Sequence, residues 1–279
     1  MPADFHRYQL PKGALMPNAV AALLVDECSR DLARVVVPSP EVHVVVRFGS
    51  SVPGGVDVHA LGIRPTVHRK LVRGGQRVIL ARLRLGTHAA VLGSPASELA
   101  GRVVTLEDLW GRSAAQCLLD RLAGVRDVEP AARILERAIA ARTTNSRRSD
   151  ARLSLVTAAA QRLEHASVSA VAHQLSMSER HLRRVFSDAT GLSPKTFAKL
   201  KRFGRAVEAV ETTAETSWSQ VAAGAGYYDQ AHMIAEFRSI AGVTPRAFLT
   251  ELRGQADDQL ARVAVHVLDA GEWRAAEQR

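Results

Sequence analysis

Three arginines in one short stretch have the spacing of neighbours on a single helix face. In SERHLRRVF, residues 178–186, Arg180, Arg183 and Arg184 stand at i, i+3 and i+4, and the Leu, Val and Phe of the stretch form an apolar stripe with the helical period. Burial of that stripe would turn all three guanidiniums outward. Guanidiniums so placed can contact guanine O6 and N7 in pairs or hold phosphates. An arginine cluster is usually a solvated helix face, so its surroundings decide between these interpretations.

The frame around these arginines occurs twice. FSDATGLSPKTF at 186–197 and FRSIAGVTPRAF at 237–248 share a Phe, a Gly, an aliphatic residue, Ser or Thr, Pro, a basic residue and a final Phe, at an offset of 51 residues. A short helix and a tight turn are expected before each copy, with Ser176 and Gly226 at the turns. This order is typical of the helix-turn-helix, whose second helix enters the major groove of DNA.

Helix start signals extend through this half of the chain. Ser167, Ser193, Ser217 and Thr244 are placed as N-caps, and proline follows Ser193 and Thr244 at the first helical position. Ser217 also predicts a capping box with Gln220.

These motifs resemble the AraC/XylS transcriptional regulators, whose DNA-binding half holds two helix-turn-helix units joined by a long helix. The likeness covers residues 151–253 and rests on the two G-x-[ST]-P-x-x-[FY] endings and on GYYDQAHMIAEF. It implies that the second helices of the two units enter successive major grooves on one side of the duplex. It further implies two base-reading sets: Arg180, Arg183 and Arg184 in the first unit, and Gln230, Ala231, Ile234 and Ala235 in the second.

Phosphate contacts are expected beside helix starts, where backbone N–H groups favour anions. The candidates are Ser178, Lys195, Lys199 and Arg246. Lys195 and Lys199 lie in the window where charge is most concentrated, and Arg246 lies in the matching part of the second unit. From Arg180 to Arg205 the chain has eight basic residues and one acid, which predicts a basic stripe.

The second helix, in DQAHMIAEFR at 229–238, departs from the resemblance because the family usually has an arginine where Ala235 stands. Two interpretations remain open. The second unit could lack base readout, or Gln230 could pair with adenine while Ala231 or Ile234 packs against a thymine methyl.

The first half of the chain is predicted to be β-rich. EVHVVVRF at 41–48 alternates with the period of a half-buried strand, and VDVHALGI at 56–63 and QRVILARLRL at 76–85 have the same character. Two amphipathic helices are expected at 110–124 and 130–142. The fold class is therefore α+β: a β-rich domain, cupin-like or a partial barrel with flanking helices, followed by an all-α domain with two helix-turn-helix units.

This half also resembles an N-terminal domain of unknown function that often precedes such a DNA-binding half. EVHVVVRFG, VHALGIRP and VVTLEDLWG carry the likeness. Near residue 87, where the resemblance predicts Pro-Gly-Gly, the chain reads LGTHAAVLG, so a pocket shaped by that loop would differ here.

A basic run in RPTVHRKLVRGGQR suggests a candidate site for an anionic effector, such as a nucleotide. Its residues are Arg64, Arg69, Lys70, Arg73 and Arg77. A solvated strand and loop is the alternative, because charge runs are usually exposed. A third alternative is dimerisation through the apolar faces of helices 110–142, which could equally pack on the sheet.

The main alternative function is enzymatic: a cupin-like metal-dependent enzyme fused to a DNA-binding module. His43, His59, His68 and His88 lie in the β-rich half, but no HxH pair accompanies them, so surface histidines are favoured over metal ligands. Cys28 and Cys117 fit neither a zinc site nor a methyl-accepting site and are interpreted as buried thiols. We expect no enzyme activity, no metal and no cofactor.

Composition is consistent with a DNA-binding regulator in the cytoplasm. The chain of 279 residues has a net charge of +9, and neither an apolar run of membrane length nor a signal pattern occurs. The expected partners are double-stranded DNA, a small effector, RNA polymerase and a second copy of the chain. The expected organisation is a sensing or dimerisation domain at 1–142, a linker at 143–150, a DNA-binding domain at 151–253 and a helical tail at 254–279.

Overall fold

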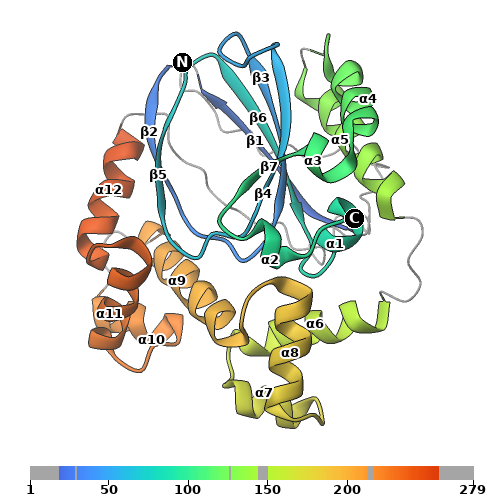
Figure 1. Ribbon diagram of the computed structural model, residues 1–279. Coiled ribbons are helices and arrows are strands. Elements are labelled where there is room, and N and C mark those ends of the chain that lie inside the picture. Colours follow the sequence, from blue (N-terminus) through green and yellow to red (C-terminus); the bar gives the residue numbers. More distant parts are fainter. Residues whose placement is uncertain (1–18, 29, 126, 144–149, 213–216, 258–279) are drawn as a thin grey trace, which may run out of the picture.

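The computed structural model describes residues 19–28, 30–125, 127–143, 150–212 and 217–257. Most of the predicted linker, and all of the predicted tail beyond residue 257, lie outside the described residues. Figure 1 shows a β-rich half with helices along one side and, below it, a half built only of helices.

Antiparallel strands make up the sheets of the first half. They are β1 (Val20–Cys28), β2 (Leu32–Val36), β3 (His43–Gly49), β4 (Val56–Leu61), β5 (His68–Val72), β6 (Gln76–Leu83) and β7 (Val103–Thr105). Five strands pair in the order β1-β6-β3-β4-β7, and β2 pairs with β5. The three runs predicted as strands are β3, β4 and β6. In the described residues the strands form two separate sheets, not a closed barrel.

Helices follow and flank the strands. They are α1 (His88–Leu92), α2 (Ala96–Leu99), α3 (Leu106–Trp110), α4 (Arg112–Leu122), α5 (Val128–Thr143), α6 (Asp150–Leu163), α7 (Val168–Gln174), α8 (Glu179–Thr190), α9 (Pro194–Thr212), α10 (Trp218–Ala225), α11 (Gln230–Ala241) and α12 (Pro245–Asp257). The two helices predicted at 110–124 and 130–142 are α4 and α5. The long helix expected between the helix-turn-helix units is α9.

One face of the larger sheet packs against α4 and α5. The alternating residues Val44 and Val46 of β3 are fully buried on this face, and so are Leu135 and Ile139 of α5. Leu118 and Leu122 of α4 are also buried. The apolar faces considered for dimerisation are therefore largely covered within the chain, because they supply the helix layer over the sheet.

Two junctions between the halves are visible in the described residues. Below the β-rich half, Gly191 ends α8 with a φ of 74°, and a Cβ on it would come within 2.6 Å of the Ala96 Cβ on α2. Nearby, a Cβ on Gly86 would be 3.3 Å from Leu153 on α6. The segment LGTHAAVLG thus forms α1 and a contact with the helical half, and no residue of it lines either of the two cavities described below.

The second junction joins the small sheet to the end of the chain. The backbone N–H of Val67 donates to the Ile240 carbonyl at 2.9 Å, and the Arg69 side chain reaches α11 and α12. In Figure 1, α12 lies beside β2 and β5.

Candidate DNA interface

The first helix-turn-helix unit consists of α7, a tight turn and α8. Ser167 caps α7 by accepting a hydrogen bond from the Ala170 N–H, and Ser178 caps α8 through the His181 N–H at 3.2 Å. Between the helices, Ser176 has a φ of 54°. This backbone region is rare for non-glycine residues and suits a tight turn. The unit therefore has the geometry predicted from the sequence.

The arginines of α8 all face solvent. Leu182 and Phe186 are 1% exposed, whereas Arg180, Arg183 and Arg184 are exposed. Arg183 forms an ion pair with Glu179 one turn earlier, and Arg184 lies 3.2 Å from the His181 ring nitrogen. An exposed pair of this kind is worth at most about 0.5 kcal/mol, so phosphate or guanine can replace it. Arg180 has no hydrogen-bond or ion-pair partner in the described chain.

The second unit, α10 and α11, repeats this geometry. Gly226 ends α10 with a φ of 83°, and Asp229 caps α11 by accepting from the His232 N–H at 2.7 Å. Ser217 stands at the N-cap of α10, but its side chain makes no cap bond and contacts the Ser219 hydroxyl instead. The predicted capping box with Gln220 is therefore wrong, because a neighbouring hydroxyl competes for Ser217.

The repeated phenylalanines explain the shared frame. Phe186 packs edge-on against Phe197, with ring centroids 5.3 Å apart. In the second copy Phe237 and Phe248 both pack against Phe203 of α9, at 4.5 and 5.6 Å. The shared phenylalanines thus form core contacts that hold the second helix of each unit, α8 or α11, in place within the helical half.

The exposed face of α11 is uncharged at the predicted base-reading positions. Gln230, Ala231 and Ala235 are exposed and Ile234 is half-buried. Gln230 and Ile234 line a hollow of about 290 Å³ together with Thr244 and Arg246 at the start of α12. Trp218 of α10 also lines it, a residue that sequence reasoning missed. The structure thus brings a base-reading candidate and a phosphate candidate of the second unit to one place.

Only part of the basic stripe predicted from Arg180 to Arg205 lies on the protein surface. Arg202 of α9 pairs with Glu236 of α11 at 2.8 Å, and Arg205 donates to the carbonyl oxygens of Ala225 and Glu164. Lys201 pairs with Glu164 at 3.0 Å. These cations lie inside the helical half because α9 runs between the two units, so each of its faces meets a neighbour.

The phosphate candidates differ in their availability. Ser178, Lys195 and Arg246 are exposed. Lys199 is half-buried, and its ammonium group donates to the Ser239 hydroxyl of α11. A phosphate contact from Lys199 would therefore replace that bond.

A model of a family described as a helix-turn-helix domain matches residues 171–251, which cover both units and α9. Residues 171–251 are an AraC-type helix-turn-helix domain. DNA binding and transcription regulation are the functions of this domain. A search of curated proteins found no match.

Some solved structures are similar to part of the chain and others to most of it. The C-terminal domain of the response regulator YesN from Fusobacterium nucleatum is 19% identical and covers 37% of this chain and 98% of its own, with a TM-score of 0.32. A DNA-binding transcriptional dual regulator from Escherichia coli K-12 is 22% identical, with coverages of 41% and 99% and a TM-score of 0.32. ToxT from Vibrio cholerae O395 is 8% identical, with coverages of 83% and 97% and a TM-score of 0.41.

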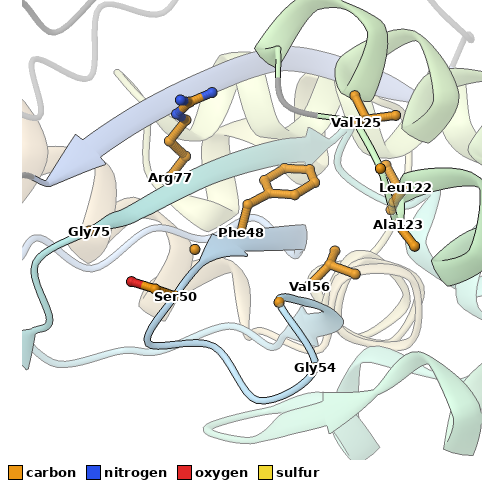
Figure 2. A pocket seen from close by; sticks show the side chains of 12 residues that line it. Phe48, Ser50, Gly54, Val56, Gly75, Arg77, Leu122, Ala123 and Val125 are labelled. Atoms are coloured by element: carbon orange, nitrogen blue, oxygen red, sulfur yellow. The ribbon is translucent and has the colours of Figure 1, made fainter.

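The residues of the basic run ahead of the AraC-type domain differ in their contacts. Arg69 binds the AraC-type domain, and Arg73 pairs with Asp31 at 2.6 Å. Arg64 is half-buried and Lys70 is exposed. Arg77 lies apart and lines a cavity of about 550 Å³ (Figure 2). Arg69, Arg73 and Arg77 therefore have different surroundings, because strand alternation and turns send their side chains in different directions.

The histidines of the β-rich half are not all on the surface. His59 and His88 are buried, His43 is half-buried and only His68 is exposed. Burial lowers the pKa of both His43 and His88 to about 4. Within the residues that the structure describes, no three His, Cys, Asp or Glu side chains gather as a metal site.

Two further features concern the thiols and the membrane. Cys117 is an exposed free thiol on α4, so its prediction as a buried thiol is wrong. The side chain of Cys28 lies outside the described residues. Among the described helices, none has the length and apolar character needed to cross a membrane.

Proposed function

We propose that this chain is a non-enzymatic regulator whose AraC-type domain reads one DNA site with two unequal recognition helices. The observation that carries the proposal is the exposed arginine face of α8, held in a helix-turn-helix frame whose second copy exposes no arginine at the equivalent positions. Arginine is the commonest specific reader of guanine. Discrimination between base pairs then comes mainly from the side chains of α8.

In the second unit, α11 contributes at most a preference for A·T pairs. Gln230 can pair with adenine, and Ile234 beside it offers apolar contact to a thymine methyl. Arg246 opens α12 next to the same hollow, so phosphate binding here does not need a charge at Ala235. This favours a weakly discriminating second unit that still anchors the duplex.

We propose that each predicted domain has its own function. Residues 1–142 serve sensing or dimerisation, 143–150 connect, and 151–253 bind DNA in the cytoplasm, where the target DNA lies. An effector that binds one arrangement of the two halves better would shift the population competent for DNA. RNA polymerase and a second copy of the chain are the further partners in this proposal.

The test compares arginine variants on a specific and a random duplex. The specific site is first located by footprinting the full chain on the DNA that flanks its own gene. Arg183→Ala and Arg184→Ala should each lose about 1–3 kcal/mol of affinity on the specific site and far less on random DNA. Arg162→Ala, an exposed arginine of α6 outside both units, is the matched control and should change neither.

Equal losses on the two duplexes would show that these arginines only hold phosphate. A wild-type chain that protects no segment and prefers no sequence over random DNA would overturn the proposal as a whole.

A further inference from the structure

Arg205 of α9 bonds to the backbone of two segments that are distant in the sequence. Its Nη2 atom donates to the Glu164 carbonyl at 3.0 Å and to the Ala225 carbonyl at 2.8 Å. Glu164 directly follows α6, just ahead of Ser167, the N-cap of α7. Ala225 is the last residue of α10, before the turn that leads to α11. One nitrogen therefore joins the entry of the first helix-turn-helix unit to the turn of the second.

Both acceptors are carbonyl groups at the C-terminal end of a helix. Such carbonyls have no partner within their own helix, and they form the negative end of its dipole. A guanidinium is always charged, and each of its terminal nitrogens carries two hydrogens that it can donate. Arg205 therefore stabilises the end of α6 and the end of α10 at the same time.

The Arg205 guanidinium is enclosed by the two segments that it joins. Its side chain is 24% exposed, and its Nη1 atom lies 4.0 Å from the Glu164 carboxylate. On the side of the second unit, a Cβ on Gly226 would come within 3.3 Å of Nη2. Gly226 has a φ of 83°, so glycine both permits this turn and leaves room for the arginine.

Two other cations of α9 each contact one unit. Lys201 pairs with the Glu164 carboxylate at 3.0 Å. Arg202 pairs with Glu236 of α11 and lies over the Tyr227 ring, 5.7 Å from its centroid. Among the described residues, the polar contacts of Lys201 thus lead to the first unit and those of Arg202 to the second. Arg205 bonds to both sides, which distinguishes it from its neighbours on α9.

We propose that Arg205 is a positioning residue that holds the two recognition helices, α8 and α11, at one separation and orientation. Two linked modules gain most affinity when the link holds each of them at the span of its site. Without Arg205, the second unit would meet its phosphates for only part of the time. This inference rests on the proposed reading of one DNA site by two units, for which it names the side chain that sets their register.

The β-rich half limits how far the second unit can move. It contacts α8 through α2, and it contacts the end of α11 through the bond from Arg69 to the Ala241 carbonyl. Loss of the Arg205 side chain should therefore widen the range of separations between α8 and α11, without releasing the second unit.

The first test measures the coupling between Arg205 and the DNA under the second unit. Arg205→Met keeps an unbranched side chain and removes its donors. The full chain is titrated with its specific duplex and with the same duplex carrying uncharged methylphosphonates in the second protected segment, where base changes do not respond to Arg183→Ala. The wild-type chain should lose about tenfold in affinity on this neutralisation, and Arg205→Met at most about threefold.

Lys201→Met is the matched control, because it removes a cation of the same helix that contacts the same Glu164. It should keep the wild-type ratio between the two duplexes. A smaller folded fraction would lower both affinities by one factor, so the ratio separates positioning from a loss of stability. An equal ratio in wild type and Arg205→Met overturns the inference, as does a wild-type chain that is indifferent to the neutralisation.

A distance measurement tests the same inference without DNA. Spin labels are attached through Asp188→Cys on α8 and Arg238→Cys on α11, both exposed positions, in a full chain whose own cysteines are replaced by serine. Arg205→Met should widen the distribution of distances between the labels, and Lys201→Met should leave it as in the wild type. A distribution that Arg205→Met does not change overturns the inference.

The two measurements keep this inference apart from the proposed function. A wild-type chain that protects no DNA segment, while Arg205→Met widens the distance distribution, would contradict the DNA-reading proposal and leave the positioning role in place. A preferred duplex with an unchanged ratio or an unchanged distribution would contradict the role of Arg205 alone.

Discussion

Arg69 of β5 and Glu251 of α12 form an ion pair, with Arg69 Nε donating to Glu251 Oε2 at 2.9 Å across 182 residues of sequence. A second nitrogen of the same guanidinium donates to the Ala241 carbonyl at the end of α11. One side chain of the β-rich half thus contacts both α11 and α12, the helices that follow the turn of the second helix-turn-helix unit. A separation of β5 from α11 and α12 would break these bonds.

A double-mutant cycle on this pair should show a small coupling. Arg69→Ala should lower the melting temperature more than Glu251→Ala, because only Arg69 also bonds to the Ala241 carbonyl. Since both side chains are partly exposed, the coupling between the two changes should be about 0.5 kcal/mol. Strictly additive effects would show that the two side chains do not interact in solution.

Arg202 should matter more for stability than any exposed arginine of the domain. Its pair with Glu236 is mostly buried, at 22% and 13% exposed, so Arg202→Ala leaves a mostly buried carboxylate with the His232 ring, 3.5 Å away, as its neighbour. We expect a loss of about 1–3 kcal/mol in the free energy of unfolding and weaker DNA binding, because α9 and α11 lose their link. Arg238→Ala, an exposed change on α11, should stay within about 0.5 kcal/mol in thermal melts. A smaller effect at Arg202 than at Arg238 would contradict this account.

Restoring the arginine that the family resemblance predicts at position 235 should add a DNA contact. Ala235→Arg should tighten binding to specific and random duplexes alike and increase the salt dependence by about one released counterion. Affinity measured at several salt concentrations gives this slope. An unchanged slope would mean that α11 does not approach the duplex through Ala235.

Glu136 on α5 should make stability depend on pH near neutrality. The side chain is 5% exposed, its Oε1 has no hydrogen-bond partner in the described chain, and burial raises its pKa to about 7. The folded chain then binds more protons than the unfolded chain between about pH 4.5 and 7, so this group lowers stability as pH rises through that window. Glu136→Gln should therefore raise the melting temperature at pH 8.

The size of that effect is bounded by the pKa shift, at most about 3 kcal/mol at pH 8 and near zero below pH 4.5. Melts of both chains at the two pH values isolate the contribution of Glu136. An equal gain at both pH values would mean that the amide improves packing and that the carboxyl does not titrate abnormally.

The sequence by itself determined the local parts of this protein. Strand alternation located β3, β4 and β6, and the helical period with its caps located both helix-turn-helix units and the outward face of Arg180, Arg183 and Arg184. These features depend on residues within a turn or two of each other, so their physical cause is present in a short window of sequence.

Only the tertiary structure decided the partners of the charged and polar side chains. Arg202 and Arg205 belong to the same basic stripe as Arg180, yet they are held inside the helical half by groups on other helices. Arg69 and Arg77 come from one basic run, but one joins the two halves and the other borders a cavity. His59 and His88 are buried although their local pattern predicted the surface. The groups that contact and bury these side chains come from segments that are distant in the sequence. Only the packing of those segments brings the groups together.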